Sequence, residues 1–199
     1  MSFHYNYNDN HYNGIQEFHC NLQCMRCVAI NRTGQQCSRR TCKHLAMCYQ
    51  HIKNLGLEVK TSSIPGAGLG LFALVDIPKG AQIAEYFGEV LTRDQIDERY
   101  GGDLGIAPYA VKLWARGLYV DSACRRSLAS YINGASRDYP ANSVFVNSTP
   151  TTINIRAARG IRAGNEIIVS YGREYFRNID NHTHETLRRK ILSSEKFYR

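Results

Sequence analysis

The sequence predicts a mainly β fold with a small metal-binding module in front of it. Short apolar segments recur between glycine-containing turns after residue 57, and cysteines crowd into residues 20–51. Short strands bounded by turn residues are typical of a protein built from several small sheets. We expect four parts: a disordered tail over 1–19, a zinc-binding module over 20–56, the β body over 57–176, and a basic C-terminal extension with a helix over 177–199.

The composition argues against a membrane-spanning chain and favours an intracellular one. No apolar run approaches the roughly 18 residues of a membrane span, and the polar segment 1–13 lacks the apolar centre of a signal peptide. The net charge is +8, and most of the basic excess lies before residue 61 and after residue 172. Basic flanks fit a folded body held near nucleic acid or chromatin. Ordinary solubilising charge is the alternative.

Six of the seven cysteines fall between Cys20 and Cys48. Thiolate and imidazole groups suit tetrahedral zinc. A segment with few large apolar residues needs a bound metal of this kind to stabilise its fold. The best four-ligand set is Cys27, Cys37, Cys48 and His51. The first two flank a predicted hairpin with Gly34 at its bend, and the last two are spaced to share one helical face.

Other cysteine arrangements stay open. Cys20, Cys24 or Cys42 could replace one of the four ligands, and disulfides are the rival interpretation, disfavoured without a secretory signal. The ligand spacing resembles that of a small zinc-finger family of viral and microbial proteins.

The body begins with a strand near Leu57 and the glycine-rich stretch 61–73. Glycine lets main-chain groups approach a bound molecule closely, where a Cβ at Gly68 or Gly70 would obstruct it. The stretch lacks the pattern of a P-loop or of a dinucleotide site. Taken alone, it fits a tight hairpin turn better than a ligand loop.

Strands and turns alternate through the rest of the body. Residues 81–86 predict a strand, and Thr92 predicts the N-cap of a short helix that ends at Gly101. The remaining predicted elements are a hairpin from 108–114 and 118–121, a helical turn within 123–136, strands over 144–146 and 152–157, and a last strand before Tyr171.

Five motifs in this order resemble a SET-domain protein lysine methyltransferase. They begin at Gly66, Glu85, Leu118, Ser127 and Gly164, and the resemblance covers about residues 57–176. The resemblance implies a SET fold of several short β-sheets with a pseudoknot where the segment around Asn133 passes the one around Tyr171. With the zinc module in front, the chain looks most like the compact SET proteins of large DNA viruses and some protists.

The resemblance also implies S-adenosylmethionine as methyl donor and a lysine that enters from the opposite face. Tyr171 would be the catalytic tyrosine, and Tyr109 and Tyr131 would line the lysine channel, although any of these could be a core aromatic. The residues implied to bind the methyl donor are Gly66, Ala67, Gly68, Leu69, Gly70, Tyr86, Asn133, Gly134, Tyr175 and Phe176.

This chain departs from the family at several positions. Gly134 stands where a histidine is usual, which puts activity in doubt more than binding. No cysteine-rich segment follows Tyr171, so Tyr175 or Phe176 is expected to cover the adenine instead. Val169 stands where relatives carry an aromatic residue, so we expect room for di- or trimethylation.

The chain also departs from the family at Arg125 and Arg126, two basic residues that stand where Gly-Asn is usual. They could contact the cofactor carboxylate or an acidic substrate, or form a solvated pair.

The leading functional hypothesis is a histone-lysine methyltransferase in the nucleus, or the host nucleus for a viral protein. One alternative is a catalytically weak SET module that binds cofactor or peptide. Another makes the zinc finger a nucleic-acid-binding part, with the SET body as scaffold. A homodimer stays open.

Overall fold

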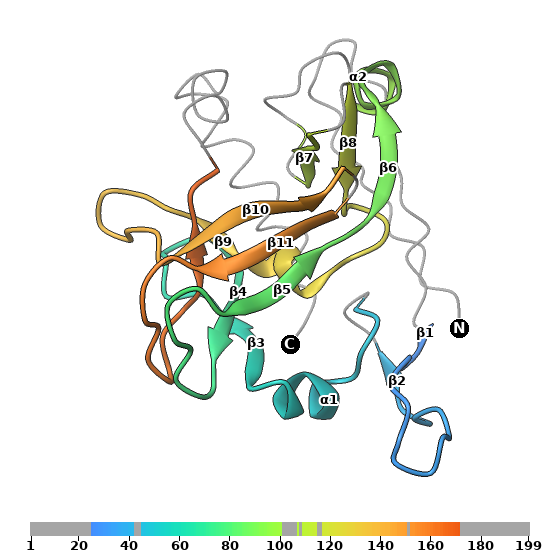
Figure 1. Ribbon diagram of the computed structural model, residues 1–199, viewed down its shortest axis with the longest axis vertical. Coiled ribbons are helices and arrows are strands. Elements are labelled where there is room, and N and C mark those ends of the chain that lie inside the picture. The colour runs from blue at the N-terminus through green and yellow to red at the C-terminus, as the bar shows by residue number, and fades with distance from the viewer. Residues whose placement is uncertain are drawn as a thin grey trace.

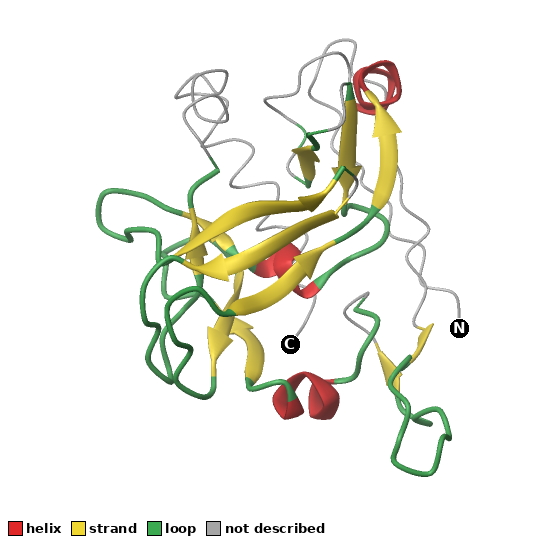
Figure 2. Ribbon diagram, in the orientation of Figure 1, coloured by secondary structure: helices red, strands yellow, loops and turns green. Residues whose placement is uncertain are grey.

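The computed structural model describes residues 25–41, 45–100, 107, 109–114, 117–150 and 152–171. In these residues the chain forms twelve strands in four sheets, two α-helices and one 3₁₀ helix (Figure 1, Figure 2). The mainly β class is therefore confirmed. The predicted tail, the C-terminal extension and its helix lie outside the described residues. No helix in the described part is long and apolar enough to cross a membrane.

The N-terminal segment contains one two-stranded sheet and one short helix. β1 (Met25–Arg26) pairs antiparallel with β2 (Arg40–Thr41). Between them the chain turns at Gly34, where φ is +79°, a value that glycine adopts at little cost. A backbone hydrogen bond of 2.8 Å from Cys37 to Ala29 closes the predicted hairpin. α1 (Tyr49–Asn54) follows, with Cys48 as its N-cap residue.

The glycine-rich stretch lies at the turn of a second hairpin. β3 (Leu57–Thr61) and β4 (Leu69–Ala73) pair antiparallel, and residues 62–68 connect them. The interpretation of this stretch as a hairpin turn is therefore confirmed.

The central sheet has five strands in the order β5-β11-β10-β12-β9. β5, β11 and β10 are antiparallel neighbours, whereas β12 runs parallel to both β10 and β9. Parallel neighbours need a crossover connection, and here the short strand β12 lies between two segments that precede it in the chain. The bounds are β5 (Gln82–Tyr86), β9 (Asn133–Gly134), β10 (Ser143–Thr149), β11 (Thr152–Ala157) and β12 (Ile168–Val169).

A three-stranded antiparallel sheet with the order β6-β8-β7 lies at one end of the molecule (Figure 1). Its strands are β6 (Glu89–Thr92), β7 (Ala110–Lys112) and β8 (Leu118–Asp121), and the predicted 108–121 hairpin is thereby confirmed. α2 (Arg93–Tyr100) follows β6 directly. Thr92 and Gln95 exchange side-chain-to-backbone hydrogen bonds of 3.3 and 2.8 Å, so the predicted N-cap is also confirmed.

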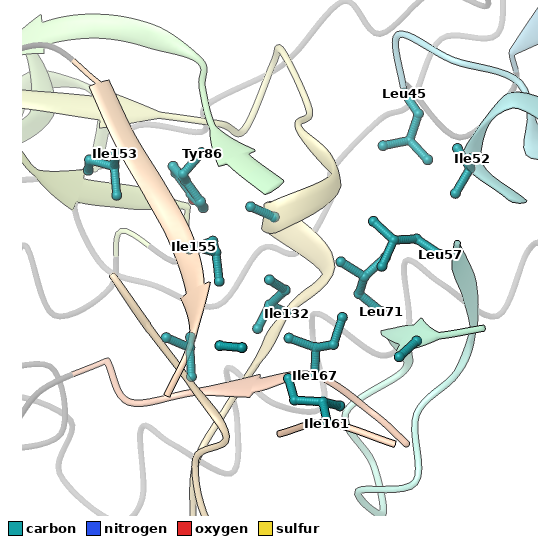
Figure 3. Close-up of a cluster of buried hydrophobic side chains, with 14 of the residues drawn as sticks. Leu45, Ile52, Leu57, Leu71, Tyr86, Ile132, Ile153, Ile155, Ile161 and Ile167 are labelled. Carbon is teal, nitrogen blue, oxygen red and sulfur yellow. The ribbon is translucent and has the colours of Figure 1, made fainter. Parts of the chain in front are cut away.

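One hydrophobic core joins the N-terminal segment to the β body (Figure 3). Leu45 and Ile52 belong to the same buried cluster as Leu57 and Leu71. The cluster continues through Ile132 in the turn after the 3₁₀ helix η2 (Leu128–Tyr131) and into the central sheet. The N-terminal segment is thus packed onto the body through apolar contacts.

Candidate active site

The glycine loop is held in a defined shape by its own backbone. Ser62 donates a 2.8 Å hydrogen bond to the Gly68 carbonyl, and Ala67 donates one of 3.1 Å to Ile64. Gly66 and Gly68 have φ values of +77° and +74°, which a residue with a Cβ rarely adopts. Two of the three glycines therefore serve the conformation of the turn.

Gly70 also has a structural role that was not predicted. A Cβ there would overlap with the Glu166 carboxylate and lie 3.2 Å from Asn133 Nδ2. The missing side chain therefore makes room for neighbouring protein atoms. Sequence reasoning had related it to close approach of a bound molecule.

The Glu166 carboxylate lies beneath the loop and is only 6% exposed. It accepts hydrogen bonds from Ser62 Oγ and from the Ser63 backbone N–H, both at 2.7 Å, and also from Ser63 Oγ. Asn133 Nδ2 donates to the same carboxylate at 2.8 Å. Glu166 therefore joins the glycine loop to β9, although these segments are far apart in the sequence.

The predicted pseudoknot has its counterpart in strand pairing beside this carboxylate. Gly134 pairs with the fully buried Val169, and the Ala135 N–H donates to the Val169 carbonyl at 2.8 Å. Asn142 holds the segment 166–168 in place. Its Oδ1 accepts a hydrogen bond from the Ile168 N–H, and its Nδ2 donates one to the Glu166 carbonyl. Asn133 and Gly134 thus lie next to the segment that leads to Tyr171.

An aromatic cluster lies where β12 leads into Tyr171. The Tyr171 hydroxyl donates a 2.7 Å hydrogen bond to the Ile132 carbonyl, directly before Asn133. Its ring stacks on Phe145 at 6.3 Å, and Phe145 meets Tyr86 edge to face at 6.1 Å. Burial, and then the proximity of Tyr171, raises the pKa of Tyr86 well above its ordinary value. The Tyr86 hydroxyl therefore acts as a neutral hydrogen-bonding group.

Tyr86 lies in this cluster, and its hydroxyl donates to the Tyr109 carbonyl at 2.7 Å. Tyr109 itself is covered by Arg126, whose guanidinium carbon is 3.6 Å from the ring centroid. Arg126 is thus a half-buried cation on an aromatic face, whereas Arg125 is exposed. The two arginines do not form the solvated pair that was one alternative.

Tyr131 is half-buried and packs against the core, so its predicted place in a lysine channel stays a prediction. Tyr175 and Phe176, expected to cover the adenine, lie outside the described residues.

Sequence reasoning assigned no role to Phe145 or Glu166. Phe145 gives no local signal beyond its strand. Glu166 does, because it is an acidic residue directly before the apolar run 167–169. A carboxylate at such a position must be paired or hydrogen-bonded when the strand is buried.

The four predicted zinc ligands come together in one cluster. The ligand atoms of Cys27, Cys37, Cys48 and His51 all lie within 4.8 Å of one another. His51 Nδ1 is 3.5 Å from Cys27 Sγ and 3.3 Å from Cys48 Sγ. Tetrahedral zinc separates sulfur and nitrogen ligands by about 3.5 Å, so the arrangement fits this metal.

The environment of Cys48 favours a thiolate. Burial alone would raise the pKa of the thiol, but hydrogen bonds from His51 lower it to about 6. Cys20, Cys24 and Cys42, the alternative ligands, lie outside the described residues.

Comparison with known proteins identifies the body. The family model for the SET domain matches residues 68–172, just over half of the chain. Histone-lysine N-methyltransferase mes-4 of Caenorhabditis elegans is 28% identical over 187 residues, which cover 79% of this chain and 20% of that protein. Histone-lysine N-methyltransferase EZH2 of Chaetomium thermophilum is 30% identical over 118 residues, which cover 56% of this chain and 8% of that protein.

Solved structures give the same match. An active polycomb repressive complex 2 in the stimulated state superposes with a TM-score of 0.51 at 30% identity, covering 58% of this chain and 15% of that one. The Chaetomium complex in an autoinhibited conformation bound to S-adenosylmethionine gives 0.50 at 28% identity, covering 68% and 17%. This chain thus spans a fifth or less of the length of these relatives.

Proposed function

Because this chain belongs to the SET-domain family, we propose that it is an S-adenosylmethionine-dependent protein-lysine N-methyltransferase acting on a histone lysine. The observation that carries the proposal is the hydrogen bond from Tyr171 to the Ile132 carbonyl, one residue before Asn133. It holds the proposed catalytic hydroxyl beside the segment implied to bind the methyl donor. The relatives named as histone-lysine methyltransferases support the substrate class.

The residues present fit the methyl donor. Two glycines with positive φ expose loop backbone, and Asn133 is half-buried beside them. When bound, S-adenosylmethionine supplies a methyl group activated by a positive sulfonium. Gly66 to Gly70, Asn133 and Gly134 would hold it, with Tyr175 or Phe176 over the adenine and Tyr86 at the aromatic side.

The rest of the chemistry falls to positioning by this chain. In the transfer, the neutral lysine nitrogen would bond to the methyl carbon as the carbon–sulfur bond breaks, and the resulting methylated ammonium would release a proton to water. Tyr171 orients that nitrogen, while Tyr131 and Tyr109, the latter with Arg126 on one ring face, line the path of the entering side chain. Correct alignment accounts for most of the acceleration in such a displacement.

We also propose that Cys27, Cys37, Cys48 and His51 bind one zinc ion in a module over 20–56, ahead of a SET domain over 57–176. Nuclear location and contact of the basic flanks with chromatin or nucleic acid are consistent with the net charge of +8. The compact viral or protist type and a homodimer are further proposals, and the former rests on the order of zinc module and SET domain.

Methyl transfer from radiolabelled S-adenosylmethionine to mixed core histones tests the enzyme hypothesis. Label should appear on one histone, and Tyr171→Phe should reduce the rate about a hundredfold because the orienting hydroxyl is lost. Tyr49→Phe is the matched control, since Tyr49 is 64% exposed on α1. Equal rates for Tyr171→Phe and the wild type would contradict the assigned role.

A second candidate function is a binding module with little turnover, favoured by Gly134 in place of the usual histidine. It predicts no label from the wild type while calorimetry still detects cofactor binding. Gly134→His should then restore transfer.

A further inference from the structure

Glu166 is a buried carboxylate without a cationic partner among the described residues. Its charge is stabilised by four hydrogen bonds, from Ser62 Oγ, from the Ser63 N–H and Oγ, and from Asn133 Nδ2. These donors come from two elements, the start of the glycine loop and β9. A buried carboxylate is retained at a cost unless its acceptor sites are filled in this way.

The two oxygens of the carboxylate serve different neighbours. Oε1 accepts from Ser62 Oγ at 2.7 Å and from Asn133 Nδ2 at 2.8 Å. Oε2 accepts only from Ser63, at the backbone N–H and the hydroxyl. A change at Oε1 therefore acts on Asn133, whereas a change at Oε2 acts on the loop alone.

These acceptors determine which way the Asn133 amide faces. Nδ2 also donates to the Leu69 carbonyl at 3.1 Å. A carbonyl and a carboxylate can only accept, so only the NH₂ end of Asn133 can face them. Oδ1 must then point the other way, and among the described residues nothing donates to it.

We propose that Glu166 is a positioning residue that fixes the Asn133 oxygen as an outward hydrogen-bond acceptor in the methyl-donor site. This inference rests on the proposed function. An outward oxygen selects a donor group, so it pairs with the ammonium of the cofactor's amino-acid end. Glu166 itself touches neither cofactor nor lysine.

Glu166→Gln tests the proposal because it keeps the shape and replaces one oxygen with NH₂. The Ser63 N–H cannot reverse its direction, whereas the Asn133 amide and the Ser62 hydroxyl can. The new NH₂ should therefore take the Oε1 side, where it opposes the NH₂ of Asn133, so that only the Leu69 carbonyl still favours the original direction of the Asn133 amide. The Asn133 oxygen then faces outward in only part of the molecules, which weakens its hydrogen bond with an ammonium.

The measurement is calorimetric affinity for S-adenosylhomocysteine and for its analogue in which hydrogen replaces the amino group. We expect the wild type to prefer the parent compound roughly tenfold or more, and Glu166→Gln to reduce that ratio toward one. Ser63→Ala, which changes only the Oε2 side, should lower both affinities equally and keep the ratio. Glu98→Gln, at an exposed position of α2, should change neither affinity.

The outcomes separate this inference from the proposed function. An unchanged ratio in Glu166→Gln would overturn the positioning role while leaving the enzyme hypothesis intact. Failure of the wild type to bind S-adenosylhomocysteine would overturn both.

A double variant covers the case in which Glu166→Gln does not fold. Combining it with Asn133→Asp exchanges the positions of the amide and the carboxylate. The NH₂ now at position 166 can donate to one carboxylate oxygen at position 133, while the other oxygen again faces outward. We expect this pair to recover the preference for the amino group. A folded double variant without that preference would contradict the proposal.

Discussion

Gly70 is the residue with the least room in the candidate site. Its β4 position faces the Glu166 carboxylate, so Gly70→Ala must displace either the carboxylate or the strand. We expect a loss of about 2–3 kcal/mol in the free energy of unfolding, as for other overpacked buried positions. Thermal denaturation measures this. Gly160→Ala should leave the free energy of unfolding nearly unchanged, because no atom lies within 4 Å of the position that its Cβ would take. Equal melting temperatures for the two variants would refute the packing argument.

Val169 is expected to set the number of methyl groups added. It is fully buried at the end of β12, two residues before Tyr171. Val169→Phe should fill the space beside the lysine nitrogen and shift the product from di- or trimethyl toward monomethyl lysine. Mass spectrometry of the modified histone reports the distribution. Val144→Phe, at a 42% exposed position, is the size-matched control and should leave the products unchanged.

Several site residues could be predicted from the sequence, but their connections could not. Tyr171 and Asn133 were recognisable from their local motifs. Gly70 was recognisable as special, although for a different reason. The partners of Glu166 lie 33 and 104 positions away in the chain, and no local pattern encodes such a pairing. Phe145 was missed for the same reason, since its importance comes from the rings it meets across the sheet.

At the level of elements, an ion pair anchors α2 to the three-stranded sheet. Asp121 is fully buried and accepts hydrogen bonds from Arg99 at 2.7 Å and from Tyr100 at 2.8 Å. Arg99 also contacts Glu89 on β6 at 2.8 Å. The helix, β6 and β8 therefore meet at one charged cluster.

Arg99→Met should be strongly destabilising because it leaves the buried Asp121 charge without its cation. We expect about 3–5 kcal/mol. Arg93→Met is the matched control on the same helix, because its pair with Asp97 is 48% and 30% exposed and should contribute at most about 1 kcal/mol. Urea denaturation of both variants gives the comparison. Similar losses for the two would show that Asp121 does not depend on Arg99.

Elements with strong local signals were predictable. The Thr92 cap, the Gly34 bend and the hairpin into β8 depend on residues close together in the chain, so turn and capping rules locate them. The pairing of β12 with β9 and β10 was accessible only through the family resemblance. β9 and β12 have two residues each, which is too few for a periodic pattern.

At the scale of the whole molecule, the N-terminal segment and the β body share one core. Leu45 and Ile52 flank Cys48 and His51, two of the proposed zinc ligands, and pack with Leu57 and Leu71. Leu45 also forms an isolated bridge to Arg126, the residue that covers Tyr109. The N-terminal segment therefore contacts, through Leu45, the arginine that covers Tyr109.

Zinc removal should accordingly lower the stability of the entire chain. We expect one zinc per chain by elemental analysis, and a lower melting temperature after chelation because metal binding contributes to folding. His51→Ala should lose the zinc, whereas Gln50→Ala, its neighbour on α1, should keep it. A chain that holds no zinc, or that melts identically in chelator, would contradict the assignment.

The late position of Glu166 has a consequence for synthesis. During translation the glycine loop emerges about a hundred residues before the Glu166 carboxylate that holds it. β9 likewise emerges before β12, the strand with which it pairs. Contacts between distant parts of a chain form slowly because a long loop must close first. In a ribosome-bound chain that ends before residue 166, β9 and the loop therefore lack these partners, and unpaired strand edges favour aggregation.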